Sequence, residues 1–479
     1  MGRQLINKES ESKEMKKILV SVVIMVLFIG LLIPHVSAEE TTKNIIKLSD
    51  DQITINGNEI STDKNESVYK TNIMDNGGTS DESKSENKEI DNIININAPG
   101  VYEFSGSLSD GQISVNANNI KGNVEIILNN IDITCEEAPA IFIYSQDTES
   151  EDCKVTITLA DGSQNTVSGG KLKINVEGFD DQESILYYIE KDYDDDGSYY
   201  ERCKYDGVIS SDISLIFEGE GTLNVNSLEK EGIESKMHIT INGGTYIIKS
   251  LDDGINASST GKSVITINDG LVVVDLQDEA EEGDGIDSNG EIYINGGTVY
   301  AFSHSGSDNG LDSDGGTYIN GGNVFSTGSM YEETVTENDT TIVQMQFSSN
   351  VNEGESIVIV DESNTPVFAY KADREISTIV YTSENLEKLE YGVYTGTSID
   401  GIVGEYDIYS DIKSVDLENM TKQENTGKAM EKRMDMRLKM EKVGYTEKNT
   451  ELAIIGGVLI GIGVIIAIVA IIGLRRKND

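Results

Sequence analysis

The 479-residue chain has no tryptophan, four prolines and three cysteines, and 84 acidic residues outnumber 37 basic ones. The formal charge of −47 excludes nucleic acid as a partner, because phosphate binding needs clustered Lys and Arg. An odd cysteine count gives no disulfide framework, so Cys135 and Cys153 either pair between neighbouring repeats or stay buried as thiols. The absence of tryptophan, together with the short repeat described next, disfavours a β-propeller.

A repeat occupies residues 205–331. One element contains an acid or amide followed by Gly and an aliphatic residue, and its glycines are spaced 25, 22, 31 and 25 residues apart. These glycines are Gly207, Gly232, Gly254, Gly285 and Gly310. A second element of the type Ile-Thr-Ile-Asn-Gly-Gly follows each of the last four, starting at Ile239, Ile265, Ile292 and Thr317. A period in the twenties with a glycine turn in every unit predicts a solenoid.

Each repeat is expected to form short strands separated by Gly, Asn and Asp corners. The Ile-x-Ile pattern has a period of two, so both Ile side chains point to one face of a strand. Such faces are buried only if equivalent coils stack about 4.8 Å apart, which pairs each strand with the coils on either side. The sequence therefore predicts an all-β fold with a parallel β-helix over residues 90–331, whose first coils, before residue 170, are less regular.

Other segments divide the rest of the chain. The apolar run after Lys16-Lys17 predicts a signal peptide at 1–38, with an uncleaved anchor as the alternative, followed by a flexible segment at 39–89. An acidic insertion is expected at 177–204, a small antiparallel β domain at 332–410 and a charged stalk at 411–450. The apolar run at 451–474 predicts a transmembrane helix, and the basic cluster in 475–479 predicts a cytoplasmic C-terminus.

These segments predict a single-pass cell-membrane protein whose repeat domain lies outside the cell. No Leu-Pro-x-Thr-Gly sequence lies upstream of the apolar run, because the only prolines are Pro34, Pro99, Pro139 and Pro366. The protein is therefore expected to stay in the membrane and not to be transferred to the wall by a sortase.

The acidic insertion contains the opening of a calcium loop. Asp192, Asp194 and Asp196 occupy positions 1, 3 and 5, and Gly197 occupies position 6. Position 12 is Cys203 in place of the usual bidentate Glu, so the pattern is incomplete. Two interpretations stay open, a calcium-binding loop and a merely acidic insertion.

Stacked coils would also place the acids of the repeat in columns. One column contains Asp206, Glu231, Asp253, Asp284 and Asn309, and its neighbour contains Glu234, Asn256, Asp287 and Asp312. Carboxylates one coil apart repel by about 3 kcal/mol at an effective dielectric near 20. Raised carboxylate pKa values or a hard cation would remove this repulsion, and Ca2+ binds six to eight oxygens. The predicted calcium ligands are Asp252, Asp253, Asn256, Asp284, Asp287, Asp308 and Asp312; the alternative is a solvated acidic edge.

The ordered series of motifs, from the alternating stretch at 124–167 to the last Asn-Gly-Gly, resembles a bacterial family. This is the secreted carbohydrate-binding β-helix family, which is similar in fold to pectate lyases; the resemblance covers roughly residues 90–410. It implies a right-handed parallel β-helix, bound calcium, and binding of cellulose and acidic pectic polymers without established catalysis. The insertion at 177–204 and the C-terminal membrane anchor depart from the family pattern.

The composition constrains the ligand that this resemblance implies. A chain at −47 repels an acidic polysaccharide unless a cation bridges the carboxylates, so binding of such a polymer should need calcium. Neutral glucans need a flat aromatic platform, for which the candidates are Tyr300 and Phe325 in one outward column and Tyr293 and Tyr318 in another. Alternatively, the insertion or the C-terminal domain covers these aromatic residues.

Catalysis is disfavoured. No arginine lies between Arg202 and Arg374, and the lysines in this region share no register, so no basic group is placed to remove a proton beside a uronate carboxylate. Asp252-Asp253 could imitate the acid pair of a hydrolase, but His238 and His304 lie in unrelated contexts. The sequence favours a calcium-dependent polysaccharide-binding protein. A lyase or hydrolase on the same fold and a structural or adhesive surface protein are the alternatives.

Overall fold

The computed structural model describes residues 43–72, 90–136, 138–170, 189–193, 199–203, 207–277, 280, 283–303 and 308–427. Within these ranges the chain forms β-strands and three short 3-10 helices, η1 (Ala117–Asn119), η2 (Glu405–Asp407) and η3 (Leu417–Asn419). The predicted all-β class is confirmed. No helix in the described ranges is long and apolar enough to cross a membrane. The predicted signal peptide (1–38), transmembrane helix (451–474) and tail (475–479) lie outside those ranges.

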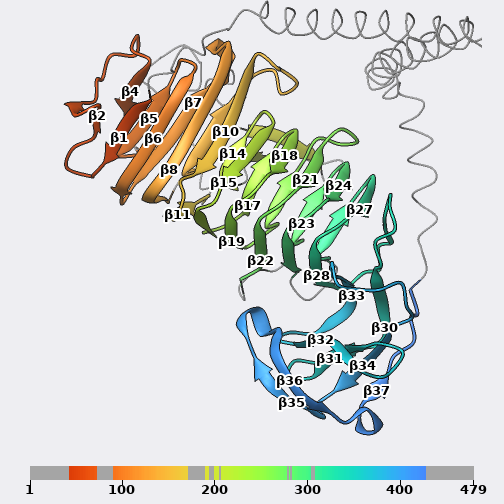
Figure 1. Cartoon of the computed structure of the whole chain (residues 1–479). Helices are drawn as coiled ribbons and strands as arrows, with labels where there is room; N and C mark the ends of the chain where they lie inside the picture. The colour runs from red at the N-terminus through yellow and green to blue at the C-terminus, as the bar shows by residue number, and fades with distance from the viewer. Residues whose placement is uncertain are drawn as a thin grey trace, which may run out of the picture. The chain divides into compact units, whose positions relative to one another are not determined.

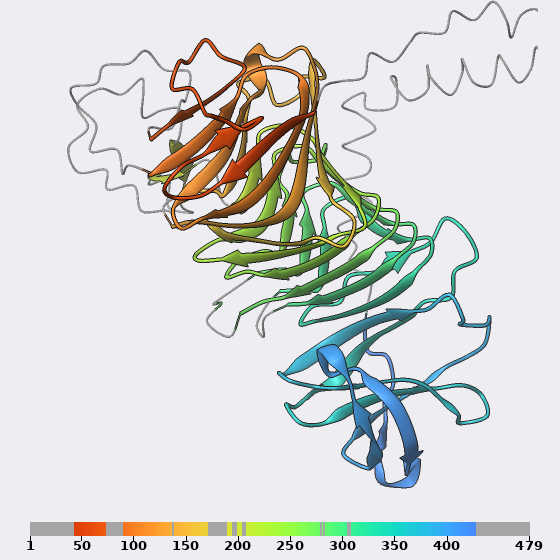
Figure 2. The same ribbon diagram turned by 60° about the vertical axis from the view of Figure 1, so that its left-hand side comes forward.

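Most strands belong to three stacks of parallel strands (Figures 1 and 2). Stack 1 contains β6 (Gly100–Leu108), β8 (Gly122–Cys135), β10 (Cys153–Leu159), β15 (Leu215–Gly219), β18 (His238–Ile241), β21 (Val264–Ile267), β24 (Glu291–Ile294) and β27 (Gly316–Ile319). Stack 2 contains the second half of β8, then β11 (Gln164–Gly169), β16 (Thr222–Ser227), β19 (Thr245–Lys249), β22 (Leu271–Asp275), β25 (Thr298–Phe302) and β28 (Asn323–Gly328). Stack 3 contains β5 (Asn92–Ile96), β7 (Gly111–Asn116), β9 (Ile141–Tyr144), β14 (Gly207–Ser211), β17 (Glu231–Ser235), β20 (Ile255–Ala257), β23 (Ile286–Ser288) and β26 (Leu311–Ser313).

Each of the last four repeats contributes one strand to each stack. The chain passes from stack 3 to stack 1 to stack 2 and then begins the next coil, as in β20, β21 and β22 followed by β23, β24 and β25. Equivalent residues of successive coils are paired partners, for example Ile265 with Ile292 and Val272 with Val299. The register predicted for these coils from the two repeated elements is observed.

The stacks surround one long core built from columns of β-branched residues. Ile241, Ile267, Ile294 and Ile319 are paired in register along stack 1 and are each fully buried. Burying one such side chain stabilises the fold by about 1.5–3 kcal/mol. The period-two alternation in the sequence is therefore the direct cause of the inward-facing columns.

Corners between stacks 1 and 2 are made by the Asn-Gly-Gly elements. The last residue of each, or of the Asn268-Asp269-Gly270 variant, is a glycine with a left-handed backbone, as at Gly297, where φ is +76°. A Cβ added at Gly297 would lie 2.6 Å from the carbonyl oxygen of Gly270 in the preceding coil, so only glycine fits there. The asparagines that precede these glycines form a ladder of side-chain hydrogen bonds along the corner.

The segment predicted to be flexible at 39–89 is instead largely ordered between residues 43 and 72. Strand β1 (Asn44–Leu48) pairs with β6, β4 (Val68–Thr71) pairs with β5, and β2 (Thr54–Ile55) forms a hairpin with β3 (Asn58–Glu59). Ile46 and Ile53 are buried in the main core. The flexible-segment prediction is wrong for this part, because sparse aliphatic residues among many charges still cover the open edge of the first coil.

The alignment of the first repeat was also wrong by one residue. The sequence elements place Gly207 opposite Gly232, but the strands pair Gly207 with Glu231 and Ile209 with Ile233. As a result Ser210, not an acid, lies over Glu234. Asp206, which was expected to begin the acidic column, lies outside the described residues.

The two cysteines that were candidates for a bond lie far apart on β8 and its neighbour. Cys153 pairs with Gly122 at the start of β8, whereas Cys135 ends that strand and pairs with Gly169 of stack 2. The two residues are therefore on different stacks and do not form a disulfide with each other. Within the predicted insertion, β12 (Ile189–Tyr193) pairs with β13 (Tyr199–Cys203) as an antiparallel hairpin.

A C-terminal β domain follows the stacks. Its strands are β30 (Val343–Val351), β31 (Ser356–Val360), β32 (Pro366–Lys371), β33 (Ile376–Thr382), β34 (Gly392–Gly396), β35 (Ile399–Val403), β36 (Tyr409–Val415) and β37 (Thr421–Lys422). All pairings among them are antiparallel, as predicted. β33 also pairs with β28, and β29 (Thr334–Val335) pairs with β27, so both join the last coil. The boundary predicted at 410 is too early, because β36 and β37 occupy the start of the expected stalk.

Candidate functional site

The acids of the repeat meet at the corner where stack 2 turns into stack 3. Asn256, Asp287 and Asp312 are paired in register in β20, β23 and β26, so this predicted column is observed. The neighbouring column follows from backbone bonds, since the nitrogen of Gly254 donates to the oxygen of Asp284 and that of Gly285 to the oxygen of Asn309. Residues about two dozen apart in the sequence therefore lie over one another.

Three carboxylates come closest together at this corner. Asp284, Asp287 and Asp312 each offer one oxygen, and these oxygens all lie within 4.8 Å of one another. All three side chains are half-buried. We call this group the acidic triad. It combines three of the seven residues that the sequence predicted as metal ligands in this corner.

Backbone amides orient the neighbouring carboxylates. Oδ1 of Asp253 accepts a hydrogen bond of 2.7 Å from the backbone nitrogen of Asp284, and Oδ1 of Asp284 accepts one of 2.5 Å from Asn309. Asp308 lies outside the triad and accepts a bond of 3.1 Å from the nitrogen of Gly283. These contacts fix carboxylate positions between successive coils but leave the mutual repulsion in place.

Burial raises the pKa of the Asp284 carboxyl to about 9, and the charges of Asp253 and Asp312 add to the effect. Burial also raises the pKa of Asp287, again with contributions from Asp253 and Asp312. The pKa of Asp253 is raised by burial and by the charge of Asp252. Half-buried carboxyl groups in this environment bind protons near neutral pH unless a cation replaces those protons.

The side-chain amide of Asn256 adds another oxygen at this corner. Its Nδ2 donates to Oδ2 of Asp253 at 3.0 Å and to Oε1 of Glu231 at 3.4 Å. Its Oδ1 is buried and accepts no hydrogen bond from any residue that the structure describes. A buried acceptor next to several carboxylates is the type of donor set that suits a hard cation such as Ca2+.

Two residues near the triad have roles that the sequence did not indicate. Asp252, predicted as a ligand, forms an ion pair of 3.1 Å with Lys230 and lies outside the triad. Glu332 follows the last coil and accepts a bond from the nitrogen of Ser313, and its charge helps to raise the pKa of Asp287. Glu332 lies beyond the repeat, so no periodic signal could have identified it.

The other predicted calcium loop is described only in part. Asp192 lies in β12, where its backbone pairs with Tyr200. Asp194 and Asp196 lie outside the described residues.

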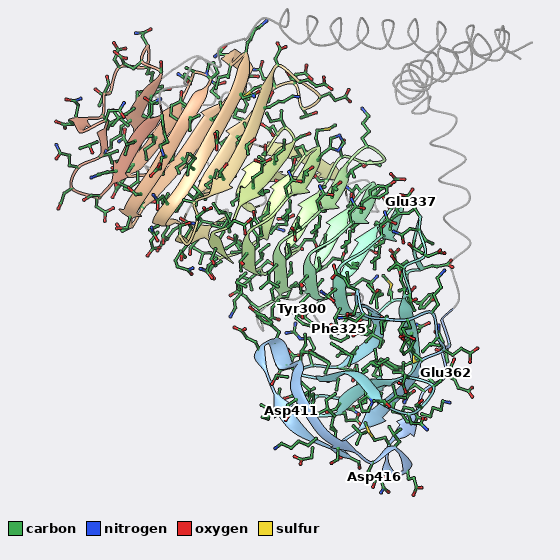
Figure 3. The ribbon with its side chains drawn as sticks, viewed as in Figure 1. Tyr300, Phe325, Glu337, Glu362, Asp411 and Asp416 are labelled. Atoms are coloured by element: carbon green, nitrogen blue, oxygen red, sulfur yellow. The ribbon has the colours of Figure 1, made fainter. Side chains whose placement is uncertain are left out.

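The predicted aromatic columns differ in accessibility. Phe325 is 0% exposed and contacts Phe368 and Tyr370 of the β domain with ring centroids 4.7 and 4.9 Å apart. Phe325 is therefore unavailable to a sugar, and the alternative that the C-terminal domain covers this column is correct for it. Tyr300 stays half-buried and contacts Tyr406, with ring centroids 5.9 Å apart; Figure 3 labels both Tyr300 and Phe325 at this junction.

Tyr293 and Tyr318 form a pair on the outward face of stack 1. Their ring centroids are 4.8 Å apart and their planes differ by 9°, so each ring covers one face of the other. The hydroxyl of Tyr293 donates to Oε2 of Glu291 at 3.0 Å. The inner ring faces cover each other, and the next residues in the row on either side are Thr266 and Val335, so the ring edges are the part that the pair presents outward.

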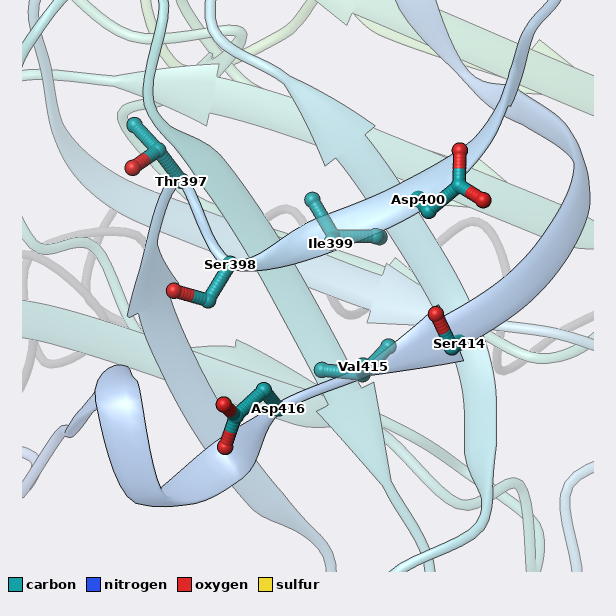
Figure 4. Close-up of a pocket in the computed structure, with 7 residues that line it drawn as sticks. All are labelled: Thr397, Ser398, Ile399, Asp400, Ser414, Val415 and Asp416. Carbon is teal, nitrogen blue, oxygen red and sulfur yellow. The ribbon is translucent and has the colours of Figure 1, made fainter.

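A pocket of about 400 Å3 lies between β35 and β36, away from all of these residues (Figure 4). Asp400 and Asp416 supply its acidic lining. Oδ2 of Asp416 accepts a hydrogen bond of 2.7 Å from Nδ2 of Asn419, and the Asp416 nitrogen donates to the oxygen of Ser398 at 2.9 Å. Local turn structure therefore accounts for the position of Asp416.

Stacked parallel strands with an acidic corner define the class of this protein as an all-β repeat protein. The chain belongs to the carbohydrate-binding domain-containing protein family, whose model matches residues 90–374. A carbohydrate-binding domain-containing protein of Acetivibrio thermocellus is 27% identical over 157 residues, which is 33% of this chain and 45% of the relative. The chain thus matches less than half of that relative's length.

A solved structure, that of the polysaccharide lyase-like protein from C. thermocellum as a gadolinium derivative, was also found. It is 20% identical, with a TM-score of 0.36, and the match covers 62% of this chain and 95% of that protein.

Proposed function

We propose that this protein binds polysaccharide at the cell surface, that its acidic triad holds calcium, and that the three stacks form a right-handed parallel β-helix. Family membership supports polysaccharide binding. The calcium proposal rests on one observation, the three oxygens of Asp284, Asp287 and Asp312 within 4.8 Å of one another. The apolar runs at the two ends of the sequence support secretion and a membrane anchor.

The triad residues would hold the ion, with Asp253 and Asn256 beside them. A bound Ca2+ would neutralise these carboxylates and bring a positive charge to a surface that otherwise repels acidic polymers. The chain's own contribution is orientation, because the amides of Asp284 and Asn309 hold carboxylate oxygens of the preceding coil in place. Binding of polygalacturonate should then need calcium, whereas binding of a neutral glucan should depend on it only through stability.

Calcium titration of chelator-treated protein tests the metal proposal. Binding to the folded state alone raises stability by about 2.7 kcal/mol at a concentration 100 times the dissociation constant. We expect a higher melting temperature with calcium for the wild type and for Asp132→Asn, an exposed acid outside the corner. We expect the increase to be lost in Asp287→Asn. A melting temperature that is the same in calcium and in excess EGTA would remove the calcium proposal.

Pull-down on swollen cellulose and on pectin, with and without calcium, tests polysaccharide binding. Retention on either polymer supports the proposal, and no retention on both would favour a structural or adhesive protein.

A lyase is the second candidate, with Lys230 at the edge of the acidic corner as its basic residue; the Lys230 ammonium group forms an ion pair of 3.1 Å with Asp252 and would have to lose its proton to act as the base. Unsaturated products released from polygalacturonate would support that activity. Their absence with calcium-loaded protein would support a non-catalytic binder.

A further inference from the structure

The outward face of stack 2 changes character along its length. In β11 and β16 it carries six uncharged polar side chains that are exposed or half-buried. They are Gln164, Thr166, Ser168, Thr222, Asn224 and Asn226. We call these residues the neutral face. In β22, β25 and β28 the equivalent central positions are Val273, Tyr300 and Phe325, which pack against the C-terminal β domain.

Hydrogen bonds between neighbouring strands order the neutral face. Nε2 of Gln164 donates to Oγ1 of Thr222 at 3.1 Å, and Nδ2 of Asn224 donates to the backbone oxygen of Asn165 at 3.1 Å. Because the strands pair in register, the six side chains form rows that repeat from coil to coil. The result is an ordered polar surface on a chain whose formal charge is −47.

An aromatic side chain of the β domain lies further along the same row, where it contacts Tyr300, three strands beyond Asn224. Ile247 follows Asn224 in the central row and packs, half-buried, against the core of the β domain. Beyond it, Tyr406 at the tip of the β35–β36 hairpin contacts Tyr300 of stack 2, with ring centroids 5.9 Å apart. Tyr406 is itself half-buried, so part of its surface stays open to solvent.

The backbone at this tip is unusual. Tyr406 has φ 55° and ψ 32°, and Asp407 has φ 56°, so two consecutive residues with bulky or charged side chains are left-handed. Such a turn favours Asn and Gly, and a tyrosine in this conformation is uncommon. The stability of the turn alone would favour another residue at this strained position. The presence of tyrosine therefore points to a role of its ring.

We propose that the neutral face and the Tyr406 ring together bind a neutral polysaccharide chain. Amide and hydroxyl side chains match the hydroxyl groups of sugars as both donors and acceptors, and the tyrosine offers a surface for the apolar side of a sugar ring. Glu405 and Asp407 flank Tyr406 and would repel a uronate polymer at this position. This inference deepens and rests on the proposed polysaccharide binding, and it assigns that binding to stack 2 and not to the Tyr293–Tyr318 pair of stack 1.

Three variants of the full-length chain test this assignment on phosphoric-acid-swollen cellulose in excess calcium. Thr245→Glu puts a charge on the outward side of β19, in the same row as Thr222. Thr266→Glu is the matched control, because Thr266 is an equally half-buried outward threonine on stack 1, next to Tyr293. Tyr406→Asn removes the ring and introduces a residue that the left-handed turn prefers.

We expect Thr245→Glu and Tyr406→Asn each to lower the apparent affinity for swollen cellulose about five- to ten-fold, as the loss of one sugar contact implies. Thr266→Glu should bind like the wild type. The inference is overturned if Thr245→Glu binds like the wild type, if Thr266→Glu is the variant that loses binding, or if the wild type binds only polygalacturonate. These outcomes leave the proposed function standing, whereas a wild type that binds neither polymer removes both.

Discussion

Two corners of the same coils differ in the side chains that lie over one another. Asparagines stack at one corner and aspartates at the other, and only the asparagines satisfy one another's hydrogen bonds. At the corner between stacks 1 and 2, Nδ2 of each asparagine donates to Oδ1 of the one before, with distances of 2.8, 2.9 and 3.1 Å along Asn242, Asn268, Asn295 and Asn320. At the corner between stacks 2 and 3, Asp284, Asp287 and Asp312 bring three carboxylate oxygens together within 4.8 Å.

The difference lies in the side-chain chemistry. An amide carries both donors and an acceptor, so a column of asparagines satisfies itself whatever its length. An ionised carboxylate only accepts, so a column of aspartates needs protons, a lysine or arginine, or a metal ion. The asparagine ladder therefore stabilises the fold by itself, whereas the acidic triad makes part of the stability depend on the solvent.

The largest expected effect is a pH dependence of the acidic corner without calcium. Between about pH 4 and pH 9 the folded protein holds a proton on Asp284, whose pKa is raised to about 9, while the unfolded chain has released it. The free energy of unfolding should therefore fall as pH rises through this window, by about 4.5 kcal/mol between pH 4.5 and pH 8, since a difference of one bound proton is worth about 1.4 kcal/mol per pH unit. Urea unfolding of chelator-treated protein measures this slope.

The variant Asp284→Asn isolates the contribution of this carboxyl, since the difference from the wild type should grow with pH. Saturating calcium should flatten the slope of the wild type. If the free energy of unfolding depends on pH equally in the wild type and in Asp284→Asn, the acidic corner does not make stability depend on the solvent as described.

A smaller effect is expected where an arginine neutralises an acid. Arg374 of the β domain donates to Asp275 of β22 at 2.6 Å and to Asp373 at 2.7 Å, and it also contacts the backbone oxygen of Ser303. Arg374→Met should cost about 2 kcal/mol, less than a fully buried pair because the Asp275 side chain is 40% exposed. Thermal unfolding measures the loss.

The double variant Arg374→Met/Asp275→Asn should recover part of that stability, because it removes one of the stranded carboxylates. If the single variant melts like the wild type, this ion pair contributes nothing to docking of the β domain.

The smallest effect on stability is expected when an aspartate replaces one asparagine of the ladder between stacks 1 and 2. Asn295→Asp removes the donor to Asn268 while keeping an acceptor for Asn320, so two acceptors face each other at one step. Because the ladder is exposed, the cost should be about 1 kcal/mol, measured by urea unfolding at pH 7. Lowering the pH to 4 should reduce the loss, since a protonated carboxyl can donate again. An equal loss at both pH values would argue against the donor explanation.

The acidic corner was predictable because the fold is periodic in its last four coils. Asn256 lies nine positions before Ile265, whereas Asp287 lies five positions before Ile292, because the loop that follows the acid differs in length. The Gly-aliphatic pair that precedes each of these residues still aligns Asn256, Asp287 and Asp312 in one column. Counting failed at the first repeat, where the strands pair Gly207 with Glu231. A glycine there does not reveal whether it sits at a corner or one residue before it.

The sequence by itself determined the strand period, the inward columns and the acids that share a column, because neighbouring coils repeat the same local hydrogen-bonding pattern. Only the tertiary structure decided that Phe325 is covered, that Glu332 joins the acidic corner and that Tyr406 meets Tyr300. Each of these contacts involves a segment outside the repeat or the surface that such a segment covers. Each contact forms only once, so it produces no periodic pattern in the sequence.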